Sequence, residues 1–182
     1  MREIKKVFSH GELSLLRALV GGTWLHYAIP LRDAQPDYAL VDIVLRTSDA
    51  AIALHVEDEG DESGGFSFVS IDKDIGSELT ARRLGGVFSH FKTQTIRQIS
   101  ILRLNINFES RSEDSFALTQ DVGILFEFET GVLSVMKNPY FDMDFKISQA
   151  PTFDRLELPP WGPIRVPKLG EHFEVAVDRI SI

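Results

Sequence analysis

The sequence predicts a mainly β protein, built as an antiparallel sandwich or barrel with one to three short helices. Apolar and polar residues alternate at period two in several segments, of which 99–108 is the longest. Turn sequences separate these segments at close spacing, as in antiparallel all-β folds. The expected strands do not alternate regularly with helices, so the pattern gives no support for a parallel sheet. The 182 residues are 43% hydrophobic, which suffices for one compact domain spanning 1–182.

The first half contains strand-like segments rich in aromatic and β-branched residues. Residues 13–20 fit either a helix or a strand, and the same ambiguity holds for 95–101. Residues 72–84 predict a short helix that Gly85-Gly86 closes. Strands are expected at 23–29, 38–46, 50–56 and 66–71, with a hairpin around Thr47-Ser48-Asp49.

The second half also contains strand-like segments separated by turns. A second hairpin is expected around Glu129-Thr130, and Pro159-Pro160-Trp161-Gly162-Pro163 excludes regular structure at that point. The last strand is expected to close the fold or lie at a sheet edge, because it is short and terminal. Strands are expected at 99–108, 124–128, 131–136, 140–147 and 173–177.

An internal duplication is the second expectation about the fold. Val7-Phe8-Ser9-His10 recurs as Val87-Phe88-Ser89-His90, a shift of 80 positions. The neighbourhood continues in step, since Ile52 faces Val132 at the same shift. The pattern predicts two related units of about 80 residues, 1–80 and 81–160, with 161–182 as a Pro-rich tail that carries a closing strand. A chance tetrapeptide match between two β-rich stretches is the alternative.

Composition excludes several classes of protein. The net charge is −8, and residues 1–80 hold 14 acidic residues against 7 basic ones, which argues against a nucleic-acid binder. The chain has no cysteine, so it has no disulfide, thiolate metal site or cysteine nucleophile. No apolar run is long enough for a membrane span, and the first residues do not resemble a secretory signal. A cytoplasmic location is therefore the default expectation.

An acidic run at 57–62 is the main candidate for a binding surface. It lacks the ligand spacing of an EF-hand loop, and its counterpart in the second half, Lys137-Asn138-Pro139, is not acidic. Trp161 is added because a tryptophan in a Pro-rich segment suits a surface role. The candidate partner-binding residues are Glu57, Asp58, Glu59, Asp61, Glu62 and Trp161.

No pattern identifies a catalytic residue, a metal site or a cofactor. The five histidines form no H-E-x-x-H or H-x-H motif, and no Gly-rich sequence matches a phosphate-binding loop. His10 and His90 fit turn or cap positions, while His26 and His55 lie on strands that could be neighbours. The pair Asp142 and Asp144, like Glu127 and Glu129, fits the solvent side of a half-buried strand.

Two functions from different classes remain. The first is a non-enzymatic protein-binding module whose acidic surface engages a basic protein; an immunity-type antagonist, which neutralises a toxin by covering it, would suit this size and charge. The second is a small-molecule-binding β barrel or an enzyme with a site between the two halves. Its candidate residues are Asp142, Asp144, His26 and His55. The sequence leaves the oligomeric state open.

Overall fold

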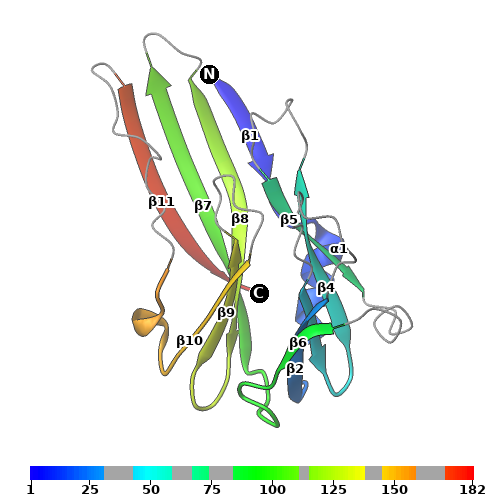
Figure 1. Ribbon diagram of the computed structural model, residues 1–182. Coiled ribbons are helices and arrows are strands. Elements are labelled where there is room, and N and C mark those ends of the chain that lie inside the picture. The colour runs from blue at the N-terminus through cyan, green and yellow to red at the C-terminus, as the bar shows by residue number, and fades with distance from the viewer. Residues whose placement is uncertain (31–42, 59–66, 74–83, 111–114, 138–144, 159–170) are drawn as a thin grey trace.

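The computed structural model contains two β-sheets that face each other (Figure 1). It describes residues 1–30, 43–58, 67–73, 84–110, 115–137, 145–158 and 171–182. Among these residues the fold is mainly β, and neither sheet closes into a barrel, because each ends in strands with a single neighbour. The predicted fold class is thus confirmed at the level of a mainly β protein with two antiparallel sheets.

The first sheet, called the long sheet below, has the strand order β10-β9-β8-β7-β11, and β1 adds to one end of β8. Its central strands are long: β7 spans 13 residues and β8 spans 12. All pairs are antiparallel except β1 with β8, which is parallel. The bounds are β1 Arg2–Lys6, β7 Gln98–Ser110, β8 Phe116–Glu127, β9 Val132–Lys137, β10 Phe145–Ala150 and β11 Glu171–Ser181.

The second sheet, called the short sheet, has the order β5-β4-β3-β2-β6 and is antiparallel throughout. Its strands are five to eight residues long. Both predicted hairpins are present, β3 with β4 and β8 with β9. The bounds are β2 Trp24–Pro30, β3 Ile43–Thr47, β4 Ala51–Asp58, β5 Ser67–Lys73 and β6 Leu84–Phe88.

The helix α1 (His10–Arg17) resolves the ambiguity at 13–20 in favour of a helix. Ser9 caps it: the Ser9 hydroxyl accepts from the Glu12 backbone N–H, and a Glu12 carboxylate oxygen accepts from the Ser9 N–H at 2.7 Å. The other Glu12 oxygen accepts from the Ile71 N–H of β5 at 2.9 Å. One side chain thus starts the helix and ties it to the short sheet.

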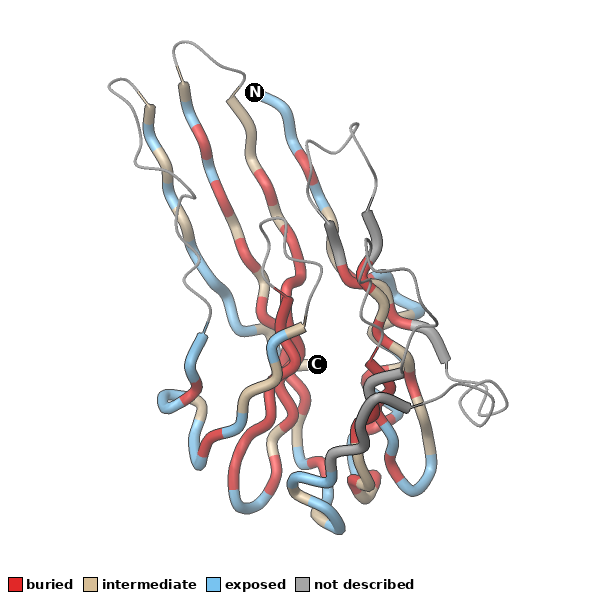
Figure 2. Tube along the Cα trace, viewed as in Figure 1, coloured by how far each residue is buried: buried red, intermediate tan, exposed pale blue. Residues whose placement is uncertain are grey.

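Apolar side chains of both sheets meet in one core cluster. Trp24 and Leu45 of the short sheet contribute to it, as do Ile99 and Phe126 of the long sheet and Leu16 of α1. Trp24 lies 5.4 Å from Phe126 and 5.7 Å from Phe128, measured between ring centroids. In Figure 2 the buried residues of the long strands are concentrated in the half that lies across from the short sheet. Burial of these side chains therefore holds the two sheets together.

The structure differs from the sequence predictions at three places. Residues 2–6 form a strand that the sequence did not predict, and this strand gives the fold its parallel pair. Gly85 and Gly86 do not close a helix but lie within β6, which pairs with β2. The last strand lies at the edge of the long sheet as expected, but β11 is longer than expected, at 11 residues. The remainder of the expected helix, 74–83, lies outside the described residues. A 3₁₀ turn, η2, spans Phe153–Arg155.

Gly131 closes the β8–β9 hairpin where there is no room for a side chain. A Cβ there would lie 2.7 Å from the Ala150 carbonyl oxygen and 3.0 Å from the Phe91 ring. We expect Gly131→Ala to lower the free energy of unfolding by about 1–3 kcal/mol, because a backbone oxygen cannot move away cheaply. Urea unfolding measures this. Gly11→Ala in α1 is the control: its nearest contact is at 3.8 Å, so a gain of up to about 1 kcal/mol is expected. Equal effects of the two changes would contradict the prediction.

Candidate functional site

The side of the long sheet that faces the short sheet changes character along its length. Ile99 and Ile101 of β7 lie in the shared core. The next residues on the same side are Arg103, Asn105 and Asn107, because side chains of a strand alternate. The short sheet does not extend as far as the long strands (Figure 1). We call this polar half of the inner side the open face.

Strand pairing shows which residues share the open face. On β11, Asp178 is opposite Arg103 and Glu174 is opposite Asn107; on β8, Thr119 is opposite Asn105. On β1, Lys5 is opposite Thr119. Most of these side chains are exposed or half-buried. The open face comprises Glu3, Lys5, Arg103, Asn105, Asn107, Glu109, Ala117, Thr119, Asp121, His172, Glu174, Ala176 and Asp178.

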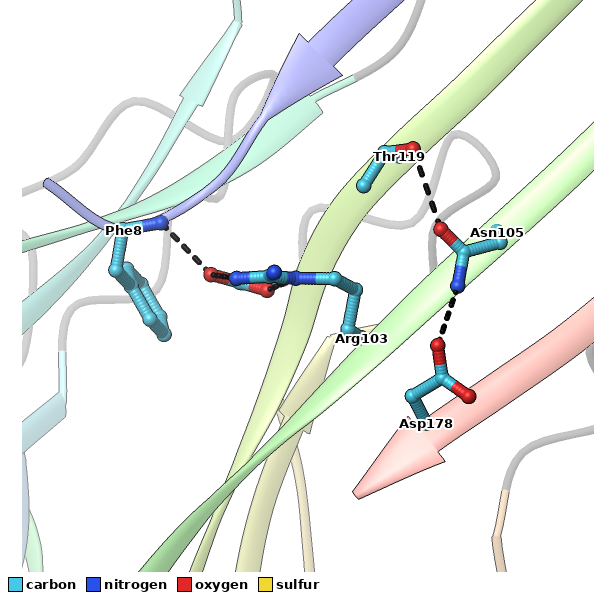
Figure 3. Close-up of polar contacts among 6 residues, drawn as sticks. Phe8, Arg103, Asn105, Thr119 and Asp178 are labelled. Carbon is cyan, nitrogen blue, oxygen red and sulfur yellow. Dashed lines mark hydrogen bonds and ion pairs between the residues drawn. The ribbon is translucent and has the colours of Figure 1, made fainter. Parts of the chain in front are cut away.

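Hydrogen bonds between neighbouring strands order the centre of the open face (Figure 3). The Thr119 hydroxyl donates to the Asn105 side-chain oxygen at 3.2 Å, and the Asn105 amide donates to Asp178 at 2.9 Å. This row joins β8, β7 and β11. It fixes the side chains of the row relative to one another.

Asp121 anchors one end of the open face and is itself 1% exposed. Arg103 donates to its two oxygens from Nε at 2.7 Å and Nη2 at 3.1 Å, and the Phe8 N–H donates at 2.7 Å. The hydrogen bond to Asp121 raises the pKa of Arg103, so the guanidinium stays charged. The β7–β8 register shifts beside Asp121, because β8 has one extra residue between the partners of Leu102 and Arg103.

The open face carries more negative than positive charge. Its basic side chains are Lys5 and Arg103, of which Arg103 is neutralised by Asp121. His172 and Glu174 form an exposed pair at 3.0 Å, and the hydrogen bond from His172 lowers the pKa of Glu174. Glu174 therefore stays ionised at neutral pH. The carboxylates of the face are Glu3, Glu109, Asp121, Glu174 and Asp178.

The structure describes only the first two residues of the acidic run predicted from the sequence, and these belong to the short sheet. Glu57 and Asp58 form the end of β4, opposite Phe68 and Ser67 of β5. The other predicted partner-binding residues, Glu59, Asp61, Glu62 and Trp161, lie outside the described residues, as do Asp142 and Asp144. The run therefore stays a prediction.

The histidines are dispersed over the fold. His26 and His55 are not on neighbouring strands, because β3 lies between β2 and β4. Both point away from the shared core, since the residues next to them, Tyr27 and Leu54, belong to it. His10 begins α1, and the ring of His90 stacks on Tyr27 at 6.2 Å between centroids. Within the described part of the chain, no group of three or more His, Asp or Glu side chains could hold a metal ion.

Comparisons with known proteins give no relative. No family model matches the chain, no curated protein sequence matches it, and no solved structure matches its fold. In the portion that the structure describes, no helix is long and apolar enough to cross a membrane.

The sequence contains a local signal for the open face. In 99–108, Arg103, Asn105 and Asn107 alternate with Leu104 and Ile106. That pattern predicted the strand correctly. It also showed that one side of the strand changes from isoleucine to polar residues after Ile101, which is the point where the shared core ends.

Proposed function

We propose that this chain is a non-enzymatic protein-binding module that covers a basic protein with an acidic surface, as an immunity-type antagonist does. One observation carries the proposal: the inner side of the long sheet continues beyond the core as an ordered, acid-rich open face. The strands β7, β8 and β11 are long, and each rises about 3.3 Å per residue. Their polar halves, lying side by side, therefore offer a broad surface. Broad, polar and preordered surfaces suit protein partners.

Charge favours a basic partner. The face has four exposed carboxylates, Glu3, Glu109, Glu174 and Asp178. Against them stands Lys5, the one basic side chain of the face that forms no ion pair with a described residue. In a chain of net charge −8, this surface adds to a field that attracts cations over roughly a Debye length, about 8 Å at physiological salt. Complementary charge speeds association and selects against acidic partners.

Charge reversal on the open face tests the proposal. The variant Glu109→Lys/Glu174→Lys changes two exposed residues on neighbouring strands. We expect it to lose capture of the basic partner from an extract of the source cells, read by quantitative pull-down at two salt concentrations. Asp154→Lys/Glu157→Lys is the control, because it alters the net charge equally at exposed sites in and beside η2.

A third variant, Glu57→Lys/Asp58→Lys/Glu59→Lys, tests the acidic run separately. Loss of capture in either the face variant or the run variant, with capture kept by the control, identifies the working surface. If both variants capture the same proteins as the unmodified chain, the proposal of an acidic binding surface is wrong. Circular dichroism confirms that each variant is folded before it is compared.

We further propose that the two sheets form a sandwich of two duplicated units. The support is their common order: each is a four-strand meander, with a fifth strand beside the first. The hairpins also agree in register, because Leu45 pairs with Ile52 as Phe126 pairs with Leu133. Their turns are closed alike, by Thr47 N–H to Ala50 O and by Phe128 N–H to Gly131 O.

The contact between Thr23 and Thr95 supports an approximate two-fold axis between the units. These residues form an isolated antiparallel bridge. On one side Trp24 N–H donates to Gln94 O, and on the other Ile96 N–H donates to Gly22 O. Gly21 and Thr93, each two residues before Thr23 and Thr95, both have positive φ, 85° and 69°. This correspondence differs from the shift of 80 expected from the sequence, and superposing 19–29 and 43–56 on 91–101 and 124–137 tests it.

A further inference from the structure

His26 and Arg46 lie on the outer side of the short sheet, away from the open face, and the charge of Lys92 also acts on His26. His26 of β2 and Arg46 of β3 are direct cross-strand partners, which places their Cβ atoms about 5 Å apart. Lys92 comes from the 89–94 turn, which is held against β2 by Trp24 N–H to Gln94 O at 2.8 Å and Thr93 N–H to Trp24 O at 2.9 Å. Arg46 and Lys92 are exposed, and His26 is half-buried.

No acid balances this cluster within the described part of the chain. Neither Arg46 nor Lys92 forms an ion pair there, although the protein as a whole is acidic. The adjacent strand β6 has the sequence Leu-Gly-Gly-Val-Phe and brings no charge. Asp49, an acid in the β3–β4 turn that follows Arg46, instead accepts a hydrogen bond from the Ser48 hydroxyl at 2.7 Å.

The position in the long sheet that corresponds to His26 and Arg46 carries a different set of charges. There Gln98 and Glu127 are the cross-strand partners, and Arg179 of the fifth strand, β11, pairs with Glu127. In the short sheet, Arg46 stands where Glu127 stands, and the fifth strand supplies no opposite charge. The short sheet therefore lacks a counter-charge that the long sheet provides from within the chain.

Electrostatics at His26 agree with this geometry. Burial, together with the charges of Arg46 and Lys92, lowers the pKa of His26. The imidazole is therefore neutral at pH 7 while the cluster is empty, and like charges around it oppose protonation. A bound anion would reverse that opposition and favour the protonated imidazole.

We propose that His26, Arg46 and Lys92 form a binding site for a tetrahedral dianion, of the kind that a phosphomonoester carries. A planar guanidinium binds two oxygens of such a group at once, while the lysine and the imidazole can donate to the others. The site lies on the short sheet and does not depend on the open face. Small phosphorylated molecules and free phosphate share this chemistry.

Titration of the full-length protein with inorganic phosphate, phenyl phosphate and acetate tests the site, read by the ring resonances of His26. We expect the two phosphates to bind and Arg46→Gln to weaken them at least about tenfold, the value of one charge-assisted hydrogen bond. Arg155→Gln, an exposed arginine on η2, should change nothing. Tighter binding of phenyl phosphate than of phosphate indicates an organic phosphate as the natural ligand; the reverse indicates free phosphate.

Sulfate gives the pH test, because its charge is constant between pH 5 and 8. We expect its affinity to rise as pH falls through that range, by at most about tenfold per unit, since binding takes up one proton at His26. His26→Gln should remove the pH dependence. Equal affinity in Arg46→Gln and the unmodified protein, equal loss in Arg155→Gln, or acetate binding as tightly as phosphate would each overturn the proposal.

Discussion

Asp121→Ala is expected to lower the free energy of unfolding by about 3 kcal/mol, the lower end of the cost of breaking a buried ion pair. The carboxylate is 1% exposed and accepts from Arg103 twice and from the Phe8 N–H. Removing the Asp121 carboxylate leaves the buried Phe8 N–H without an acceptor and Arg103 without its counter-charge. Arg103 is partly exposed and can turn to water, which keeps the cost from being larger. Chemical unfolding followed by circular dichroism measures it.

Two further variants separate this anchor from an ordinary surface acid. Asp178→Asn changes an exposed acid that accepts one hydrogen bond from Asn105, so its effect should stay within about 0.5 kcal/mol. In a double-mutant cycle, Arg103→Gln and Asp121→Asn should couple by at least about 1 kcal/mol, because the two residues share two hydrogen bonds. Additive effects in the cycle, or an Asp121→Ala protein as stable as the original, would contradict the proposed anchor.

Strands that pair with their neighbours in sequence were predictable. In β3–β4 and β8–β9 the partner lies a few residues away, so alternation and a turn sequence together contain the information. The strand β1 is different. It has one buried apolar residue, Ile4, and its partner Leu118 lies more than a hundred positions away. A local pattern holds no signal for such a pairing.

One other feature required the tertiary structure for the same reason. Gly85 and Gly86 indicate a turn by local propensity, yet pairing with β2 places them in a strand. The helix α1, by contrast, had a local signal, since Ser9 and Glu12 have capping-box spacing ahead of the apolar residues. That signal could have resolved the ambiguity at 13–20.

The candidate site was predictable only in part. Alternation in β7 shows that Arg103 and Asn105 share one side of a strand. Whether that side meets another sheet depends on how far the short sheet extends, which no local pattern specifies. The acidic run 57–62 was chosen for charge density alone. The open face is less dense in charge, and it emerges only when four strands from distant parts of the chain are brought together.

Trp24→Ala is expected to have the largest effect on stability, a loss of about 4 kcal/mol, as for other buried aromatic residues truncated to alanine. Trp24 is fully buried at the start of β2 and packs on Phe126 of the opposite sheet and on Phe128, which directly follows β8. Its backbone also bonds to Gln94 and Thr93, beside the Thr23–Thr95 bridge. Truncation would open a cavity at the point where the two sheets are joined, so the loss should appear as one cooperative shift in denaturant midpoint.

Trp24→Phe distinguishes packing from polar contribution. Within the described residues, the indole N–H of Trp24 is buried without a hydrogen-bond partner, so its removal should cost nothing and remove a desolvation penalty. We therefore expect Trp24→Phe to lose less than half of what Trp24→Ala loses, because a ring remains against Phe126 and Phe128. Val20→Ala, at an exposed site nearby in the chain, should change stability by less than about 0.5 kcal/mol. A phenylalanine variant as unstable as the alanine variant would mean that the indole N–H has a partner, and that the junction between the sheets depends on a polar contact as well as on apolar packing.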